Sequence, residues 1–407
     1  MILQTKTNNI DNKLNNPNNS SLHLQLEQLP PLSLYIHIPW CVKKCPYCDF
    51  NSHNLKGQTL PEANYIAALI ADLEQALPLI WGRCIRTIFI GGGTPSLFSG
   101  DAINQIISAV RKLTRLSPLA EVTLEANPGT VDNEHIADYY KCGVNRISFG
   151  IQSFNDKHLQ VLGRIHGKDQ AVEAINLAKQ YFTRINLDLI YGLPKQTVDE
   201  ALSDLNLALG FATTHLSCYN LTIEPNTEFF TKPPSGLPTN DLCYIMQDQL
   251  IGTLQTAGFH RYETSAFALN SDFCLHNLNY WQFGDYLGIG AGAHSKLSFH
   301  DKIVRQVRHK HPQTYMNDVL QGTHLVEDKP VGITELPFEF MLNALRLVDG
   351  FESNIFVERT GLSLSMVLKR LNYAQEKGLI KLTHGKIVPT KLGQDFLNDL
   401  LILFLEE

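Results

Sequence analysis

The sequence predicts an α/β protein: a partial (β/α)6 barrel followed by a smaller, mainly helical, winged-helix-like C-terminal domain. Short runs rich in β-branched and aromatic residues alternate with longer stretches of helical periodicity, the pattern of a parallel sheet with helical crossovers. The unusual residues lie at or just beyond the C-terminal ends of these runs, where such folds place their sites. A doubly wound sheet is the alternative that this pattern allows.

Six runs supply the predicted parallel strands, and the stretches between them, such as 61–77 and 169–182, have apolar residues at helical spacing. The runs cover residues 32–38, 85–91, 121–127, 145–152, 184–192 and 214–224. The pattern changes after residue 225. A helix at 241–259, a possible strand at 260–268, a glycine-rich segment at 284–295 and a basic loop at 301–312 are predicted there.

The last region has helices followed by a predicted hairpin within 376–393, which is the order of a winged helix. Acidic residues outnumber basic ones in this region, so a structural cap is favoured over a DNA reader. Four parts are therefore predicted: a disordered asparagine-rich tail at 1–30, the barrel at 31–265, a connecting segment at 266–330 and the helical domain at 331–407.

The composition excludes several classes of protein. The chain has 407 residues, of which 44% are hydrophobic, and a net charge of −6, so it has no field that would attract nucleic acid. No run reaches about 18 apolar residues without a charge, and no signal peptide is evident, so a cytoplasmic protein that does not span a membrane is expected. Its eight cysteines should be reduced there. Four of them are expected to be small buried hydrophobes: Cys84, Cys142, Cys218 and Cys243.

Cys41, Cys45 and Cys48 form a compact CxxxCxxC loop directly after the first predicted strand. Thiolates bind soft metals, so zinc and an iron–sulfur cluster are the two candidates. Zinc needs a fourth ligand, which His37 or His53 would supply, but structural zinc usually joins two separated pairs. A cubane cluster held by three cysteines leaves one iron open for a substrate or cofactor.

This loop, with Tyr47 before its last cysteine, resembles that of the radical S-adenosylmethionine (SAM) proteins. The resemblance implies a [4Fe–4S] cluster whose open iron chelates SAM and whose electron cleaves it to a 5′-deoxyadenosyl radical. The implied cluster ligands are Cys41, Cys45 and Cys48. The residues implied to contact SAM are Tyr35, Gly92, Gly93, Thr94, Glu125, Gln152, Arg164 and Asp188.

Residues 33–385 resemble the oxygen-independent coproporphyrinogen oxidase branch of these proteins. The motifs YIHIPWCVKKCPYCDF, GGGTPS, EANP, RISFGIQSF, LGR and DLIYGLP stand in the order of that branch. One kind of member decarboxylates coproporphyrinogen III and has a loop ending CxC, whereas haem chaperones end it in CxF and carry HNxxYW. This chain has Phe50 and the segment HNLNYW at 276–281, so a haem chaperone is favoured and the decarboxylating dehydrogenase is the alternative.

The resemblance implies haem as a further ligand, and an unidentified haem-acceptor protein of a respiratory or membrane-associated kind as partner. His276 is the expected axial ligand because neutral imidazole binds haem iron well, and Cys274 is the alternative. Lys302, Arg305 and Arg308 are expected to be solvated side chains of a basic loop, and pairing with the haem propionates is the alternative. The glycines of 288–294 do not form a dinucleotide fingerprint and are expected to line the mouth of the cavity.

Overall fold

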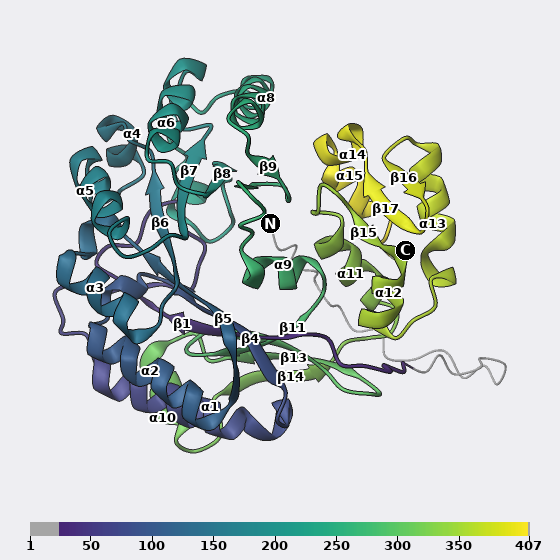
Figure 1. The fold of residues 1–407 in the computed structure, drawn as a ribbon, viewed down its shortest axis with the longest axis horizontal. Helices are drawn as coiled ribbons and strands as arrows, with labels where there is room; N and C mark the ends of the chain where they lie inside the picture. Colours follow the sequence, from purple (N-terminus) through teal and green to yellow (C-terminus); the bar gives the residue numbers. More distant parts are fainter. Residues whose placement is uncertain (1–23, 406–407) are drawn as a thin grey trace.

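The computed structural model describes residues 24–405, and a twelve-stranded sheet dominates them (Figure 1). Six of its strands run parallel in the order in which they occur along the chain. They are β1 (Leu32–Ile38), β4 (Cys84–Gly92), β5 (Arg115–Ala126), β6 (Arg146–Gln152), β7 (Ile185–Tyr191) and β8 (His215–Asn220). This arrangement confirms the predicted partial barrel.

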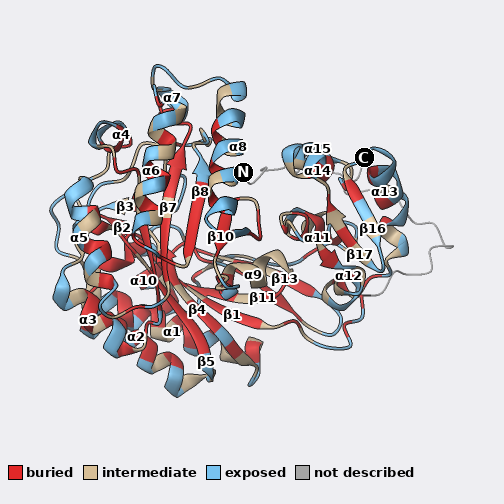
Figure 2. Cartoon of the chain, turned by 45° about the horizontal axis from the view of Figure 1, so that its top comes forward, coloured by how far each residue is buried: buried red, intermediate tan, exposed pale blue. Residues whose placement is uncertain are grey.

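Helices between these strands cover the outer face of the barrel, and the largest core lies between the two layers (Figure 2). Alternation along each strand divides its side chains between two faces, so Leu34 and Ile36 of β1 join this core while Tyr35 faces the other way. The helices are α1 (Glu62–Ile80), α2 (Gly100–Leu113), α3 (Asn133–Cys142), α4 (Asp156–Val161), α5 (Lys168–Ala178) and α6 (Val198–Gly210). Two 3₁₀ helices span Pro95–Leu97 and Pro128–Thr130.

The chain extends the sheet at both edges after the barrel. Strand β10 (Ala266–Ala268) pairs antiparallel with β8 and with β9 (His260–Arg261), so the run at 260–268 forms two short strands instead of one. Strand β11 (Asp285–Ile289) pairs parallel with the free edge of β1. Part of the glycine-rich segment is thus a strand that the sequence did not predict. Helices α7 (Glu228–Thr231) and α8 (Asn240–Thr256) lie before these additions in the chain.

The prediction of a basic loop at 301–312 is wrong, because Ile303–Arg308 forms strand β13. It pairs antiparallel with β12 (His294–Ser298) and β14 (Leu325–Pro330), so the segment 266–330 continues the barrel sheet. Helix α10 (Pro312–Val319) follows β13.

The arginine that ends β13 explains why a basic segment is a buried strand. Arg308 is 1% exposed and lies 3.1 Å from the Asp72 carboxylate on α1. Tyr315 and His324 also bond to that carboxylate. Burial alone would raise the pKa of Asp72, but Arg308 and His324 outweigh it and lower the pKa to about 2. The charge of Arg308, which the sequence pattern predicted to be solvated, is therefore neutralised by Asp72 inside the protein.

A second core lies in the C-terminal region, where a three-stranded sheet packs on helices. The elements are α11 (Leu336–Ala344), β15 (Phe351–Glu352), α12 (Ser353–Thr360), α13 (Ser365–Glu376), β16 (Ile380–Thr383), β17 (Lys386–Pro389), α14 (Lys391–Asp395) and α15 (Leu397–Ile402). This order of helices and hairpin agrees with the predicted winged-helix-like domain.

Leu24 and Leu26 are buried in the second core. The end of the predicted disordered tail is therefore ordered, and residues 1–23 of that prediction lie outside the described residues. Within residues 24–405, no helix is both long and apolar enough to cross a membrane.

Candidate functional site

The three-cysteine loop follows β1 and is closed at its base by a short parallel pair, β2 (Trp40–Cys41) and β3 (His53–Asn54). Within the loop, the Cys48 N–H donates to the Cys45 carbonyl at 3.1 Å. Thr94, which follows β4, donates its hydroxyl to Cys41 Sγ at 3.3 Å. The predicted cluster ligands and one predicted SAM contact therefore meet at the C-terminal edge of the barrel.

Burial raises the pKa of Cys41, and raises that of Cys48 to about 11. Cys45 adds to the increase in the pKa of Cys41, and Cys41 and Cys45 add to the increase in that of Cys48, so a cation that neutralises the thiolates would fit this loop. Among the described residues, no three His, Cys, Asp or Glu side chains lie close enough to ligate a single metal ion.

The two histidines considered as zinc ligands are engaged elsewhere. His37 Nε2 donates to the Asn51 carbonyl at 2.8 Å, so its Nδ1 accepts the hydroxyl hydrogen of Tyr35 at 2.9 Å. His53 Nε2 lies 3.1 Å from the Lys310 carbonyl. Neither ring nitrogen of His37 is left for a metal.

Gly92 and Gly93 bring bare backbone to the edge of the site. Gly92 has φ +115°, and a Cβ there would lie 2.5 Å from the His37 ring, so only glycine suits this position. Its N–H donates to Glu125 Oε2 at 3.0 Å, while the Gly93 N–H donates to the Ile38 carbonyl at 2.7 Å. The glycine segment is thereby tied both to β1 and to the acid on β5.

Glu125 and Asp188 form an acidic pair on the inner face of the barrel. Burial raises the pKa of Glu125 to about 7, and the negative charge of Asp188 adds to the increase. Burial also raises the pKa of Asp188, although Asn186 and Ser148 donate hydrogen bonds to its carboxylate. A ligand that brings a positive charge or hydroxyl donors to these acids would relieve the cost of ionising them.

Arg164 lies between the cysteine loop and β6. Its Nη2 donates to the Gly150 carbonyl at 2.6 Å and its Nη1 lies 3.6 Å from Cys45 Sγ. Its Nε is buried and has no partner, although native proteins satisfy most such groups. Gln152, which has φ +70°, lies beside it at the end of β6. An unsatisfied guanidinium N–H fits the carboxylate of a zwitterion such as the amino-acid end of SAM.

His276 lies apart from this edge, on helix α9 (Leu275–Trp281). Thr87 donates its hydroxyl to Ser33, so it accepts from His276 Nδ1–H at 2.8 Å, and His276 Nε2 accepts from the Tyr280 hydroxyl at 2.9 Å. Burial lowers the pKa of His276 to about 3, which keeps the ring neutral. Its ring lies 5.1 Å from Phe89, which in turn stacks on Tyr35 at 6.4 Å.

The other candidate haem contacts are also engaged. Cys274 is buried, and burial raises its pKa to about 12, with Glu121 adding to the increase. Arg305 donates to Glu339 and to the Tyr286 hydroxyl, and Arg308 is held by Asp72. Of the three basic candidates, Lys302 alone is exposed, and its ammonium lies over the Phe299 ring. The prediction that these side chains are solvated is wrong for Arg305 and Arg308.

Glu121 was missed in the sequence, although it holds α9 in place. Its carboxylate accepts the N–H groups of Leu275 and His276 at 3.2 and 3.0 Å, and Arg184 lies 2.8 Å away. The alternation of β5 was a usable signal, because Glu121 stands four residues before Glu125 and so shares its face.

Comparisons with known proteins agree with this architecture. Residues 35–208 match the Radical SAM superfamily, and residues 334–396 match the HemN C-terminal domain. The solved coproporphyrinogen III oxidase HemN of Escherichia coli, described as a radical SAM enzyme, superimposes with a TM-score of 0.78. The match covers 92% of this chain and 90% of that one at 23% identity. The fold is therefore that of a radical SAM protein with a HemN-type C-terminal domain.

Relatives at higher identity define a narrower group. The heme chaperone HemW of E. coli is 47% identical over 382 residues, covering 93% of this chain and all of the relative. The heme chaperone HemW of Haemophilus influenzae is 48% identical over 388 residues, covering 94% of this chain and all of the relative. The chain belongs to the HemW family.

Proposed function

We propose that this protein is a haem chaperone that binds haem and a SAM-coordinated [4Fe–4S] cluster and transfers haem to an acceptor protein. The observation that carries the proposal is the placement of two features inside one barrel. The three-cysteine loop lies at the C-terminal edge of the barrel strands. The helix that carries HNLNYW packs against the inner face of the same barrel. The names of the HemW relatives support the same function.

Cys41, Cys45 and Cys48 would ligate three irons, which leaves the fourth for SAM. Such a cluster supplies one-electron chemistry to a bound SAM. Glu125 and Asp188 would accept hydrogen bonds from the ammonium and hydroxyl groups of SAM, and the free Nε of Arg164 would donate to its carboxylate.

Haem would bind beside α9, where His276 offers a neutral imidazole. Its Nε2 lone pair accepts from Tyr280, so iron ligation requires that hydroxyl to turn away. Cys274 remains the alternative ligand. We expect its burial as a neutral thiol to make it the weaker of the two, because iron binds the thiolate.

Anaerobic reconstitution with iron and sulfide, followed by haem titration, tests the proposal. We expect saturable haem binding with a Soret band that changes in His276→Ala, whereas the surface variant His135→Ala should bind as the wild type does. No haem binding by the reconstituted protein would contradict the proposal, as would an unchanged spectrum in the His276→Ala/Cys274→Ala double variant.

The same preparation decides between this function and the dehydrogenase alternative. We expect no protoporphyrinogen from coproporphyrinogen III, and sustained product formation would replace our proposal. Haem transfer is measured separately, as loss of the Soret band from the loaded protein when a haem-free acceptor is added.

A further inference from the structure

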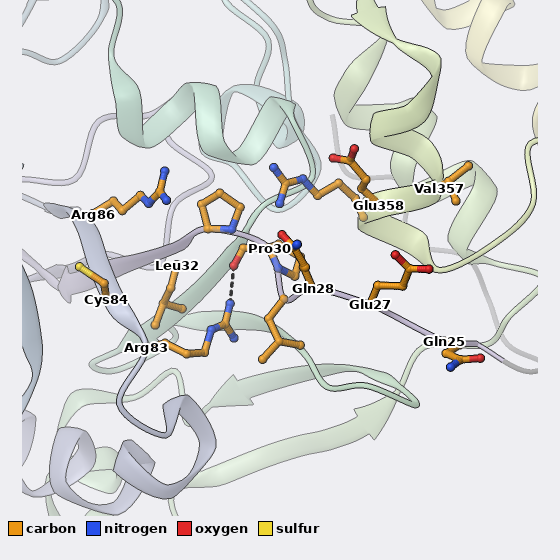
Figure 3. A pocket seen from close by; sticks show the side chains of 13 residues that line it. Gln25, Glu27, Gln28, Pro30, Leu32, Arg83, Cys84, Arg86, Val357 and Glu358 are labelled. Atoms are coloured by element: carbon orange, nitrogen blue, oxygen red, sulfur yellow. Dashed lines mark hydrogen bonds between the residues drawn. The ribbon is translucent and has the colours of Figure 1, made fainter.

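A pocket of about 700 Å³ lies far from the cysteine loop, at the N-terminal end of the barrel strands. Its walls are the segment that precedes β1, the beginning of β4, and helix α12 of the C-terminal domain (Figure 3). This volume is in the range of small-molecule sites, which commonly lie where two domains meet. The pocket is distinct from the SAM and haem sites proposed above.

Three arginines line it. Arg83 is held by Pro30 and Asp285, since its Nη2 lies 2.6 Å from the Pro30 carbonyl and 2.8 Å from an Asp285 oxygen. Its Nη1 is nevertheless buried without a partner, and so is Nε of Arg359. Within the part of the chain that the structure describes, neither Arg86 nor Arg359 has an ion pair. Residues that line the pocket thus carry guanidinium N–H groups without a hydrogen-bond partner.

The nearby acids offset part of the charge of Arg359 but, among the described residues, form no ion pair with it. Glu27 and Glu358 also line the pocket, but both are exposed, and Glu358 accepts from Asn354 instead of from an arginine. Burial lowers the pKa of Arg359, the charges of Glu358 and Asp285 act against this decrease, and the positive charge of Arg86 adds to it. Two guanidinium groups that repel each other and line the same pocket favour an anion bound between them.

Apolar side chains complete the walls. Leu29, Pro30 and Val357 line the pocket beside the arginines. A bare inorganic ion would leave these apolar surfaces in contact with water, whereas a larger organic body would cover them. Planar guanidinium groups bind carboxylates and phosphates in bidentate geometry.

We propose that this pocket binds an organic anion with two acidic groups, carboxylate or phosphate, clamped between the barrel and α12. Arg86 and Arg359 bind the acidic groups, and Arg83 contributes its free Nη1. The ligand thereby bridges the barrel and the C-terminal domain. This binding does not depend on haem ligation by His276.

Two probes distinguish a ligand with carboxylates from a ligand with phosphates. Metal-free protoporphyrin IX carries two propionates and has no iron for His276, and ATP without magnesium carries phosphates. Fluorescence quenching for the first and calorimetry for the second measure binding to the full chain. We expect saturable binding of one probe, weakened at least about tenfold in Arg86→Gln/Arg359→Gln. Binding to Arg111→Gln should match the wild type.

The proposal is overturned if neither probe binds saturably, or if the double variant binds as tightly as the wild type. Thermal unfolding of each variant checks that it is folded. If the double variant does not fold, Arg86→Gln alone serves, because Arg86 is exposed and has no ion pair whose loss would destabilise the fold. We expect this single variant to weaken binding about threefold or more, and unchanged binding would again overturn the proposal.

Discussion

Glu125 has the most informative electrostatic environment of the single residues at the barrel mouth. Burial and the neighbouring Asp188 hold its pKa near 7, so this carboxyl changes charge close to neutral pH. The Gly92 N–H that it accepts favours the ionised form but is outweighed. In the protein without cofactors, ionisation of Glu125 therefore opposes folding.

The Glu125→Gln variant should reveal this cost. The Glu125 carboxyl loses its proton near pH 4.5 in the unfolded chain and near pH 7 in the folded chain. Between these values the folded state binds more protons, so the stability of the wild type falls as pH rises. We expect the melting temperature of the variant, relative to the wild type, to increase from pH 5 to pH 8. The control is Glu134→Gln at an exposed position, for which we expect the difference in melting temperature from the wild type to be the same at both pH values. A pH-independent difference for Glu125→Gln would show that the shift is absent.

The Tyr280 hydroxyl donates a hydrogen bond to His276 Nε2, and haem iron would need the same lone pair. In Tyr280→Phe the hydroxyl is lost and the ring stays, so Nε2 no longer has to give up a hydrogen bond. If haem binds through His276, we expect haem affinity to increase by up to about tenfold, in line with one neutral hydrogen bond. Haem titration followed at the Soret band measures it. Tyr373→Phe on the surface of α13 is the control, and weaker binding in Tyr280→Phe would contradict the prediction.

At the scale of the element, α9 is seven residues long and could not be stable alone. Its first N–H groups bond to Glu121 on β5, and Asn279 bonds to Ser33 on β1. A negative charge at the N-terminal end of a helix also interacts favourably with the helix dipole. Contacts with the barrel strands therefore set the position of His276, and the intrinsic stability of the short helix contributes little.

The Glu121→Gln variant should loosen α9 without changing the shape of the barrel. It removes the charge that caps the helix and pairs with Arg184. We expect hydrogen exchange of the peptide 274–282 to accelerate about tenfold or more, while peptides from β7 remain protected. Mass spectrometry of exchanged peptides measures this, with Glu134→Gln as control. Unchanged exchange in α9 would mean that Glu121 is not what holds the helix.

At the scale of the whole molecule, two hydrophobic cores share one chain, and the segment before β1 links them. Leu24 and Leu26 pack in the C-terminal core, and Leu32 a few residues later packs in the barrel core. The pocket lined by Arg83 and Arg359 lies along this link. The segment therefore contributes to stability, although its described part, residues 24–31, contains no helix or strand.

Leu26→Ala should destabilise the C-terminal core by about 2–5 kcal/mol, because the side chain is 2% exposed and its loss leaves a cavity. Chemical unfolding followed by circular dichroism measures the change. The control is Leu119→Ala, whose side chain is 92% exposed and should cost almost nothing. A cost below about 1 kcal/mol for Leu26→Ala would show that the segment does not anchor the second core.

Much of the barrel and its mouth was predictable from local pattern. The six parallel strands follow from periodicity, which reports the burial of each run. The structure brings Cys41 and Thr94 together, and likewise Gly92 and Glu125, because the carboxyl ends of neighbouring parallel strands meet at one edge. The roles of these residues toward the cluster and SAM remain predictions.

The amino-acid sequence by itself determined the barrel, the three-cysteine loop and the family, because periodicity and short motifs are local properties. Only the tertiary structure decided that 303–308 is a strand, that Arg308 is buried, and that Tyr280 occupies His276 Nε2. The physical reason for the buried arginine is that Asp72, which neutralises it, lies more than two hundred residues away, and local pattern does not report such distant partners. The same reason hid Glu121 and the arginine-lined pocket, whose parts meet only when the chain folds.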